Sequence, residues 1–263
     1  SEMCIRDSVS STFPDNGIIQ TMMMLASIAD IQRGDLSNLK KEGVQEMEDV
    51  GRKIILAVPY YGYARQDKRF SAGEVVAAGV IASHLSNACD GIVILDIHEP
   101  KVLENIEHPI RCVTAVPEIA NWLREEVNPD FILSPDKGAV ERARNVAELI
   151  DVPYSYLEKK RIDAHTIEHS PKDLDVSGKV VAIVDDMIST GGTICRASDA
   201  LRRQGAVEVH AACTHGLFTS GALTRLAEHV DGIHSSDSLA NPRAVISGAP
   251  ALARGVQDLI GIL

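Results

Sequence analysis

Short apolar runs alternate with longer amphipathic segments along almost the whole chain. The apolar runs have the length and the β-branched content of buried strands, and predict strands at 53–59, 91–96, 131–134, 153–159, 180–184 and 207–214. The segments between them carry apolar residues at helical spacing, and predict helices at 18–32, 74–85, 116–127, 139–150 and 194–204. This alternation predicts an α/β protein whose sheets are mostly parallel and flanked by helices.

Two similar halves are expected, one at 9–113 and one at 114–263. In each half the carboxyl ends of the strands would deliver polar residues to a shared cleft, as in other open parallel sheets. The polar segment 33–51 is expected to be an exposed loop, and residues 1–8 show neither strand nor helix periodicity.

The most informative stretch is 180–193, where the apolar run 180–184 leads directly into Asp185 and Asp186. A small, hydroxyl-rich segment, 189–193, follows and opens a helical pattern. Backbone N–H groups at a helix start bind anions, and glycines allow the chain to approach them closely. Adjacent carboxylates at a strand end can hold ribose hydroxyls or a hydrated Mg²⁺. No Lys follows the glycines, which excludes the Gly-Lys-Ser/Thr nucleotide loop; the alternative is a β–α turn with an accidental Asp pair.

A second candidate segment is 60–69, which contains three tyrosines and a group of cations after a predicted strand. These residue types suit adenine stacking and phosphate pairing. They equally suit a solvated basic loop whose tyrosines pack inward.

Three further segments carry polar side chains after predicted strands. His98 lies beside carboxylates and could ligate a metal, although a lone His is more often structural. Asp136, in Ser-Pro-Asp-Lys-Gly, could bind a metal or pyrophosphate, or simply cap a helix. The cations at 159–161 precede a loop rich in His, Thr and Glu, and could close over a transferring phosphoryl group or form a solvated face.

Composition narrows the classes of partner. The chain of 263 residues has a formal net charge of −11, so nucleic-acid binding through a basic face is not expected. No apolar run approaches the length of a membrane span, so no membrane partner is expected. The five cysteines are scattered without a Cys-x-x-Cys pair, which favours a reduced, cytoplasmic setting with no zinc site.

Taken in order, these segments closely resemble the ribose-phosphate pyrophosphokinases, or 5-phosphoribosyl 1-diphosphate (PRPP) synthases, and most of all their compact archaeal-type branch. The resemblance covers nearly the whole chain from about residue 12 onward. It implies two phosphoribosyltransferase type I-like halves and an Mg²⁺-dependent transfer of pyrophosphate from ATP to ribose 5-phosphate, giving PRPP and AMP for nucleotide biosynthesis. A homo-oligomer, dimer or higher, is also implied.

The resemblance assigns the nucleotide and catalytic roles residue by residue. Arg65 and Gln66 match the Arg-Gln pair that contacts ATP. Lys159 and Arg161 match the Lys-x-Arg pair of the catalytic flexible loop. Lys159 would stabilise the charge of the transition state, and Arg161 would contact phosphate.

The metal and ribose-phosphate roles are assigned in the same way. His98 and Asp136 match the family's metal-associated positions. The residues that match the ribose 5-phosphate site are Asp185 on the ribose hydroxyls, Asp186 beside it, and Ser189, Thr190, Gly191, Gly192 and Thr193 around the 5-phosphate. Many relatives carry Asp where this chain has Ser189, so one supporting contact is expected to differ.

One segment departs from the family pattern. The family begins with a strand and a Phe-Pro-Asp-Gly-Glu-type loop that holds adenine across a subunit interface, and its spacing places that loop near residue 5. The sequence there is Cys4-Ile5-Arg6-Asp7, so the first strand and the adenine loop are expected to be missing. The similar segment 13–17 lies where the family starts its next helix, and the adenine role is not transferred to it.

Two other functions compete with PRPP synthesis. A phosphoribosyltransferase that consumes PRPP would share 185–193 but would not need 60–68 or 159–161. A non-catalytic regulatory subunit of the synthase is the second alternative, and the presence of Lys159, Arg161 and Asp185 argues against it.

Overall fold

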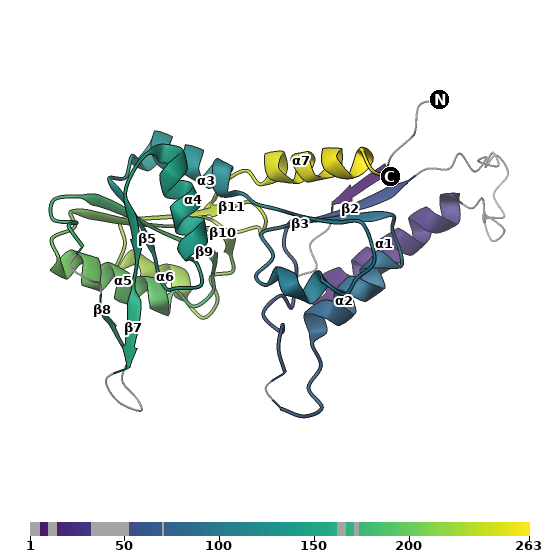
Figure 1. Cartoon of the computed structure of the whole chain (residues 1–263), viewed down its shortest axis with the longest axis horizontal. Coiled ribbons are helices and arrows are strands. Elements are labelled where there is room, and N and C mark those ends of the chain that lie inside the picture. Colours follow the sequence, from purple (N-terminus) through teal and green to yellow (C-terminus); the bar gives the residue numbers. More distant parts are fainter. Residues whose placement is uncertain (1–5, 10–14, 33–52, 70, 162–166, 171–173) are drawn as a thin grey trace. The chain divides into compact units, whose positions relative to one another are not determined.

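The computed structural model of the chain describes residues 6–9, 15–32, 53–69, 71–161, 167–170 and 174–263 (Figure 1). The chain divides into two compact units. The first comprises Ser1–Val113 and Ala249–Leu263, and the second comprises Thr114–Gly248. Residues 249–263, which were expected in the second half, lie in the first unit.

The first unit contains a four-stranded parallel sheet in the order β1-β2-β3-β4. Its strands are β1 (Arg6–Val9), β2 (Ile54–Val58), β3 (Gly91–Leu95) and β4 (Ile110–Val113). Every residue of β2 and β3 is buried, which explains their uninterrupted apolar sequences.

The expectation that residues 1–8 form no regular element is wrong for Arg6–Val9. This segment is the edge strand β1 and pairs in parallel with β2, with Arg6 opposite Ile54. Its sequence, Arg-Asp-Ser-Val, has no apolar pattern. An edge strand is held by main-chain hydrogen bonds to one neighbour, so a hydrophobic pattern could not reveal it.

Helices cover both faces of this sheet (Figure 1). On one face lie α1 (Asp15–Gln32) and α2 (Ala77–Ser86), and on the other lies α7 (Ala249–Ile260). The core on the α1 and α2 side includes Leu25, Ile54, Leu56, Val58, Tyr61, Ala82, Leu85, Ile92 and Ile94. Helix α7 comes close to the sheet at Gly255, because an added Cβ there would lie 2.6 Å from Val93 Cγ1 and 2.7 Å from Val113 Cγ1.

The second unit contains a six-stranded sheet in the order β12-β11-β10-β9-β5-β6, with every pair parallel. Its strands are β5 (Phe131–Ser134), β6 (Tyr154–Tyr156), β9 (Val180–Ile188), β10 (Glu208–Gly216), β11 (Gly232–Ser236) and β12 (Ala244–Ile246). The long central strands β9 and β10 pair from Val180–Glu208 to Ile188–Gly216. Their carboxyl ends therefore finish side by side.

Helices also cover both faces of the second sheet (Figure 1). On one face lie α3 (Val116–Trp122), which continues into a π-helical turn at Leu123–Val127, and α4 (Val140–Ile150). On the other lie α5 (Gly192–Arg203) and α6 (Ala222–Ala227). Alternate strand residues such as Val181 and Ile183 pack with Leu201 of α5 and Leu226 of α6 in one core cluster, as strand geometry requires.

Some element boundaries differ from the sequence prediction. The strand predicted at 153–159 is two strands, β6 and β7 (Glu158–Arg161), and β7 pairs in antiparallel fashion with β8 (Ile167–Ser170). The strand predicted to end at Val184 continues to Ile188, so the acidic pair lies within it.

The elements after residue 216 were not predicted, because their apolar stretches are short. The loop predicted at 33–51 lies outside the described residues.

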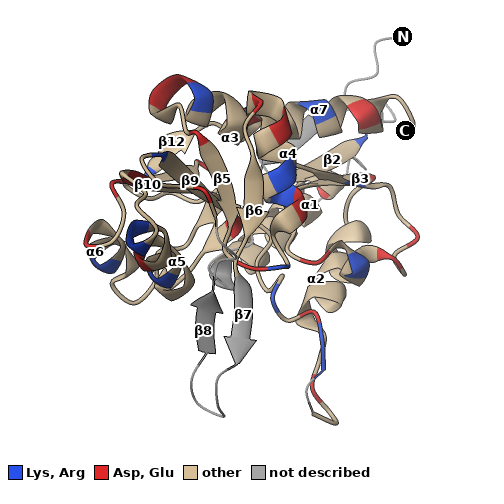
Figure 2. Cartoon of the chain, turned by 60° about the vertical axis from the view of Figure 1, so that its left-hand side comes forward, with Lys and Arg blue, Asp and Glu red and all other residues tan. Residues whose placement is uncertain are grey.

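Charged residues of both signs are interspersed over the helices and loops of the described residues (Figure 2). No helix within the described ranges is long and apolar enough to cross a membrane. Cys89, Cys112, Cys195 and Cys213 are free thiols, and Cys4 lies outside the described residues.

The close approach of α7 to β3 and β4 leads to a first prediction. Replacing Gly255 with Ala places a methyl group inside the contact distance of two valine side chains. Overpacking of this kind costs about 1–3 kcal/mol, so the midpoint of thermal unfolding should fall. The matched control is Gly261→Ala, where the nearest atom to the added Cβ, the Asp258 carbonyl oxygen, is 3.6 Å away. Equal midpoints for the two variants would contradict the packing of α7 on this sheet.

Candidate functional site

A tight turn joins the carboxyl end of β9 to the first turn of α5. It comprises residues 189–193, with Ser189 half-buried, Thr190 exposed and Gly191 buried. Gly191 is the N-cap of α5 and has φ +77° and ψ −5°, a left-handed conformation that favours glycine. A Cβ at this position would also lie 2.9 Å from Leu226 Cγ. The glycine that the sequence singled out is therefore required twice, by its φ angle and by its contact with α6.

The turn is supported by the neighbouring loop, residues 217–221, which joins β10 to α6. The Ile188 carbonyl accepts hydrogen bonds from the N–H groups of Leu217 (3.0 Å) and Phe218 (3.1 Å). Thr219 N–H donates to the Ser189 carbonyl at 3.0 Å, and the hydroxyls of Ser189 and Thr219 are 3.1 Å apart. The 189–193 turn is thus fixed by main-chain contacts before any ligand binds.

Two arginines that the sequence analysis did not select lie at this turn. Arg225 of α6 donates through Nη1 to the Thr190 carbonyl and through Nη2 to the Ser220 carbonyl at 3.3 Å. Arg196 of α5 has Nη2 3.5 Å from Thr193 Oγ1. Blue bands on α5 and α6 in Figure 2 mark the arginines of these helices. The one sequence feature that could have indicated Arg225 is that the loop before α6 follows an apolar strand, as the 189–193 turn does.

Asp185 and Asp186 lie near the carboxyl end of β9, just before the 189–193 turn. Asp185 Oδ1 accepts the N–H of Asp186 at 2.9 Å, and Asp186 Oδ1 accepts the N–H of Met187 at 2.7 Å. Burial, followed by the charge of Asp186, raises the pKa of Asp185 to about 8, and Asp136 adds to the effect. The charges of Asp186 and Asp136 thus both oppose the ionisation of Asp185.

Asp136 lies just after β5, in the turn that leads to α4. Its Oδ1 accepts the N–H groups of Gly138 at 2.8 Å and Ala139 at 3.4 Å, just ahead of α4. The Ser134 hydroxyl donates to the Asp136 carbonyl at 2.6 Å. Asp136 therefore holds the turn ahead of α4, whose N-cap is Ala139 without a side-chain cap, and its metal role remains a prediction.

Lys159 and Arg161 lie on β7, in the hairpin with β8 rather than in an irregular loop. The hairpin leaves the edge of the sheet directly after Leu157, which is fully buried and donates its N–H to the Ser134 carbonyl at 3.1 Å. The returning strand β8 passes beside α5, the helix that begins at the 189–193 turn. Both ends of the hairpin are thus tied to elements that build the candidate site.

In the first unit, the tyrosine-rich loop after β2 packs largely inward. Tyr60 and Tyr61 are buried, and the Tyr61 hydroxyl donates to the Ala78 carbonyl of α2 at 2.7 Å. Burial raises the pKa of Tyr61, so its hydroxyl stays protonated. The two tyrosines are therefore core residues and are not exposed for adenine stacking, whereas Arg65 and Gln66 are exposed beyond them.

A cavity of about 760 Å³ lies next to this loop, between α2 and the short helix η1 (Pro100–Leu103). Its lining includes Asp67, Lys68, Ser83, Glu99 and Lys101. A cavity of this size accommodates a small ligand. In the sequence, Arg65 and Gln66 come directly before Asp67 and Lys68, which line this cavity.

His98 is exposed and follows β3 in the first unit. Asp96, two residues earlier, is buried, has φ +41° and donates its N–H to the Val113 carbonyl at 2.8 Å. Within the described part of the chain, no group of three or more His, Cys, Asp and Glu side chains is arranged to hold a metal ion. His98 belongs to the first unit and Asp136 to the second.

Comparison with known proteins identifies consistent relatives. A family model described as "Phosphoribosyl transferase domain" matches residues 103–232. The chain is 42% identical over 217 residues to a ribose-phosphate pyrophosphokinase of Methanopyrus kandleri, covering 81% of this chain and 75% of the relative. It is 36% identical over 248 residues to that of Thermococcus kodakarensis, covering 94% and 82%.

The structural comparison agrees. A crystal structure of phosphoribosylpyrophosphate synthetase from Mycobacterium smegmatis has a TM-score of 0.77 and 26% sequence identity, over 98% of this chain and 82% of that chain. The predicted fold class, mostly parallel sheets flanked by helices with a phosphoribosyltransferase-type half, is confirmed.

The raised pKa of Asp185 leads to a second prediction. The folded protein holds a proton that the unfolded chain releases above pH 4, so the stability of the ligand-free protein should fall as pH rises toward about 8. Asp185→Asn removes the buried charge, and should raise the thermal midpoint at pH 8 by at least about 2 °C and flatten its dependence on pH. The midpoint is measured from pH 5 to pH 9 in EDTA without ligand.

The matched control is Asp175→Asn, because the Asp175 side chain is 92% exposed. This variant should keep the pH dependence of the unsubstituted protein. An Asp185→Asn variant with an unchanged pH dependence would contradict the assigned electrostatics.

Proposed function

The chain belongs to the ribose-phosphate pyrophosphokinase family, and from this premise we propose that it transfers pyrophosphate from ATP to ribose 5-phosphate. The products are PRPP and AMP, which places the chain in nucleotide biosynthesis. The observation that carries this proposal is the continuous site on β9 and α5, where two carboxylates precede a left-handed glycine turn.

The two parts of this site suit the two ends of ribose 5-phosphate. Ribose hydroxyls are hydrogen-bond donors, and the carboxylates of Asp185 and Asp186 are acceptors when ionised. The 5-phosphate is an anion of the size that main-chain N–H groups and hydroxyls at a helix start accommodate. Residues 189–193 supply both kinds of donor, and Arg196 and Arg225 add positive charge nearby.

The proposed reaction moves a whole pyrophosphoryl group. The anomeric hydroxyl oxygen of ribose 5-phosphate forms a bond to the β-phosphorus of ATP, and the bond from that phosphorus to the oxygen shared with the α-phosphate breaks. AMP leaves with that oxygen, and the hydroxyl proton is released. Such transfers depend on in-line positioning and on neutralising charge at the transferred group.

Lys159 and Arg161 are proposed to supply cations to the transferred group. Their strand β7 leaves the sheet at Leu157, and its partner β8 passes beside α5. A hairpin tethered at its base can bring cations to the ribose-phosphate turn without a rearrangement of the sheet. Lys159 would stabilise the charge that develops in the transition state, and Arg161 would contact phosphate.

Mg²⁺ is the proposed cofactor, with His98 and Asp136 as the family's metal-associated positions. What supports a cation near β9 is the charge of Asp186, which adds to burial in raising the pKa of Asp185, and carboxylates are the ligands that Mg²⁺ prefers. Bound Mg²⁺ would neutralise charge on the phosphates of ATP. Arg65 and Gln66 would contact ATP itself, beside the cavity of the first unit.

The cellular setting and the oligomeric state of the enzyme are also proposed. Relatives in this family and the free thiols of the described cysteines are consistent with a cytoplasmic enzyme. A homo-oligomer is proposed from the family resemblance.

The match of residues 103–232 to a phosphoribosyl transferase domain favours one alternative, a phosphoribosyltransferase that consumes PRPP. Product analysis separates the two functions. With ATP, ribose 5-phosphate and Mg²⁺ we expect stoichiometric AMP and PRPP. Base-dependent release of pyrophosphate from PRPP, without AMP formation from ATP, would contradict the synthase.

Lys159 gives the third prediction. Lys159→Ala should lower kcat at least about 100-fold while leaving the dissociation constant of ribose 5-phosphate nearly unchanged, because the cation acts on the transition state. The control is Lys160→Ala, which removes the same charge from the adjacent position of β7 and should retain activity. Steady-state kinetics and calorimetric titration supply the two measurements. Equal losses of binding and turnover would undermine the assigned role.

A further inference from the structure

Arg225 joins the two loops that follow β9 and β10. Its Nη1 donates to the carbonyl of Thr190 in the 189–193 turn, and its Nη2 donates to the carbonyl of Ser220 in the neighbouring loop at 3.3 Å. A guanidinium is a planar fork whose N–H groups lie in fixed directions. The two carbonyls are therefore held in a fixed relation by one rigid group.

The contact with the Thr190 carbonyl determines where the next N–H points. In a trans peptide, the C=O of one residue and the N–H of the next point in opposite directions. Because Arg225 binds the Thr190 carbonyl from the α6 side, the N–H of Gly191, which lies in the same peptide plane, points in the opposite direction, away from Arg225. That N–H belongs to the N-cap of α5, where the helix start favours an anion.

The residue next to Arg225 holds the same peptide from its other end. Leu226 lies where a Cβ of Gly191 would be, with its Cγ 2.9 Å from that position. Leu226 is fully buried in the core cluster that also contains Ile194 of α5. Consecutive residues of α6 thus restrain the Thr190–Gly191 peptide, one through its carbonyl and one through its glycine.

The charge of Arg225 also reaches the first turn of α5. Burial raises the pKa of the Cys195 thiol, and the positive charge of Arg225 acts against that rise. A cation fixed beside the start of α5 strengthens the preference of that helix start for an anion.

We propose that Arg225 is a positioning residue for the 5-phosphate: it holds the Thr190 carbonyl outward so that the Gly191 N–H faces the phosphate. Arg225 acts through the peptide it orients, and it need not touch the substrate. The inference deepens the proposed function and rests on it, because it takes the 189–193 turn to be the ribose 5-phosphate site.

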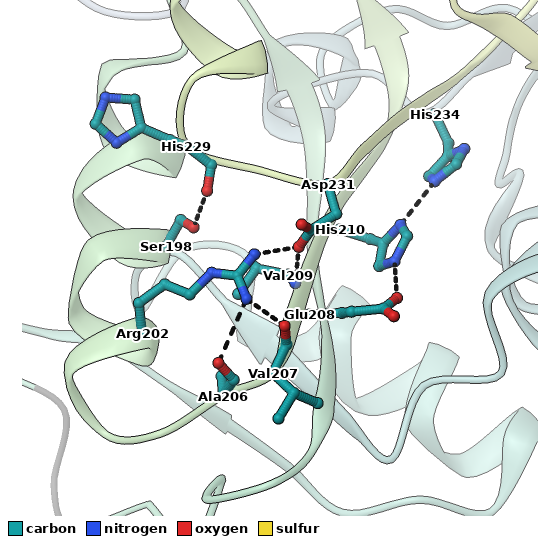
Figure 3. A network of polar contacts seen from close by, with 10 residues as sticks. All are labelled: Ser198, Arg202, Ala206, Val207, Glu208, Val209, His210, His229, Asp231 and His234. Atoms are coloured by element: carbon teal, nitrogen blue, oxygen red, sulfur yellow. Dashed lines mark hydrogen bonds and ion pairs between the residues drawn. The ribbon is translucent and has the colours of Figure 1, made fainter.

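The second unit offers a matched control at the far end of the same sheet. Arg202 of α5 also binds main-chain carbonyls, those of Ala206 at 3.4 Å and Val207, and forms an ion pair with Asp231 (Figure 3). Asp231 in turn accepts the Val209 N–H at 2.7 Å (Figure 3). Arg202 therefore has the same chemistry as Arg225 and fastens the amino end of β10, away from the turn.

The experiment compares Arg225→Ala with Arg202→Ala in the full chain by calorimetric titration with ribose 5-phosphate and, separately, with ATP. We expect Arg225→Ala to weaken ribose 5-phosphate binding about tenfold, the value of one lost charged hydrogen bond. ATP binding should change less than about twofold. Arg202→Ala should lower the thermal midpoint and leave the affinity for ribose 5-phosphate unchanged.

Guanidinium chloride at low millimolar concentration, with sodium chloride as the salt control, tests whether the guanidinium group itself is what the variant lacks. It should restore part of the ribose 5-phosphate affinity of Arg225→Ala and have no effect on the unsubstituted protein. If Arg225→Ala does not fold, Arg225→Lys replaces the fork by a single point donor, and should bind ribose 5-phosphate several-fold more weakly than the unsubstituted protein.

The outcomes separate the two claims. An unsubstituted protein that does not bind ribose 5-phosphate would overturn the proposed function. An unsubstituted protein that binds it, together with a folded Arg225→Ala or Arg225→Lys variant of equal affinity, would overturn the positioning role alone. Equal weakening of ribose 5-phosphate binding by Arg202→Ala would also overturn it.

Discussion

The left-handed backbone of Gly191 is the constraint on which the candidate site depends. A φ of +77° turns the chain from β9 into α5 within a few residues, and Leu226 leaves no room for a side chain there. Because β9 and β10 end side by side, the loops after them can support each other through the Ile188 and Ser189 carbonyls. The result is a main-chain cradle that is built before ligand binding, which reduces the ordering that a phosphate would otherwise require.

The electrostatics of the site oppose the stability of the ligand-free protein. Asp185 is half-buried beside Asp186, and its pKa is raised first by removal of the carboxylate from water and then by the charge of Asp186. The cations Arg196 of α5 and Arg225 of α6 contact the 189–193 turn that follows. Carboxylates for hydroxyl donors and a main-chain turn for a phosphate thus follow one another from β9 to α5, and cations of α5 and α6 contact that turn.

The sequence predicted the central parts of the fold well, because buried parallel strands and amphipathic helices have distinct periods. It identified the 189–193 turn because the required glycine and the hydroxyls are contiguous in sequence. It missed Arg225, since the contact to Thr190 joins residues that are 35 positions apart and no local pattern encodes it. It also missed the edge strand β1, which main-chain pairing holds, and it extended β6 through Leu157, where the chain leaves the sheet for a hairpin. The inward packing of Tyr60 and Tyr61 was one of two alternatives that only tertiary contacts could separate.

The central claim is that residues 189–193 bind the phosphate of ribose 5-phosphate. Amide chemical shifts in an ¹H–¹⁵N spectrum of the full chain, recorded during titration with ribose 5-phosphate, test it most directly. The account predicts that the largest shift changes fall on the amides of residues 190–193, with smaller changes at Asp185 and Asp186. Changes confined to the first unit, or saturation without any change at residues 190–193, would contradict it.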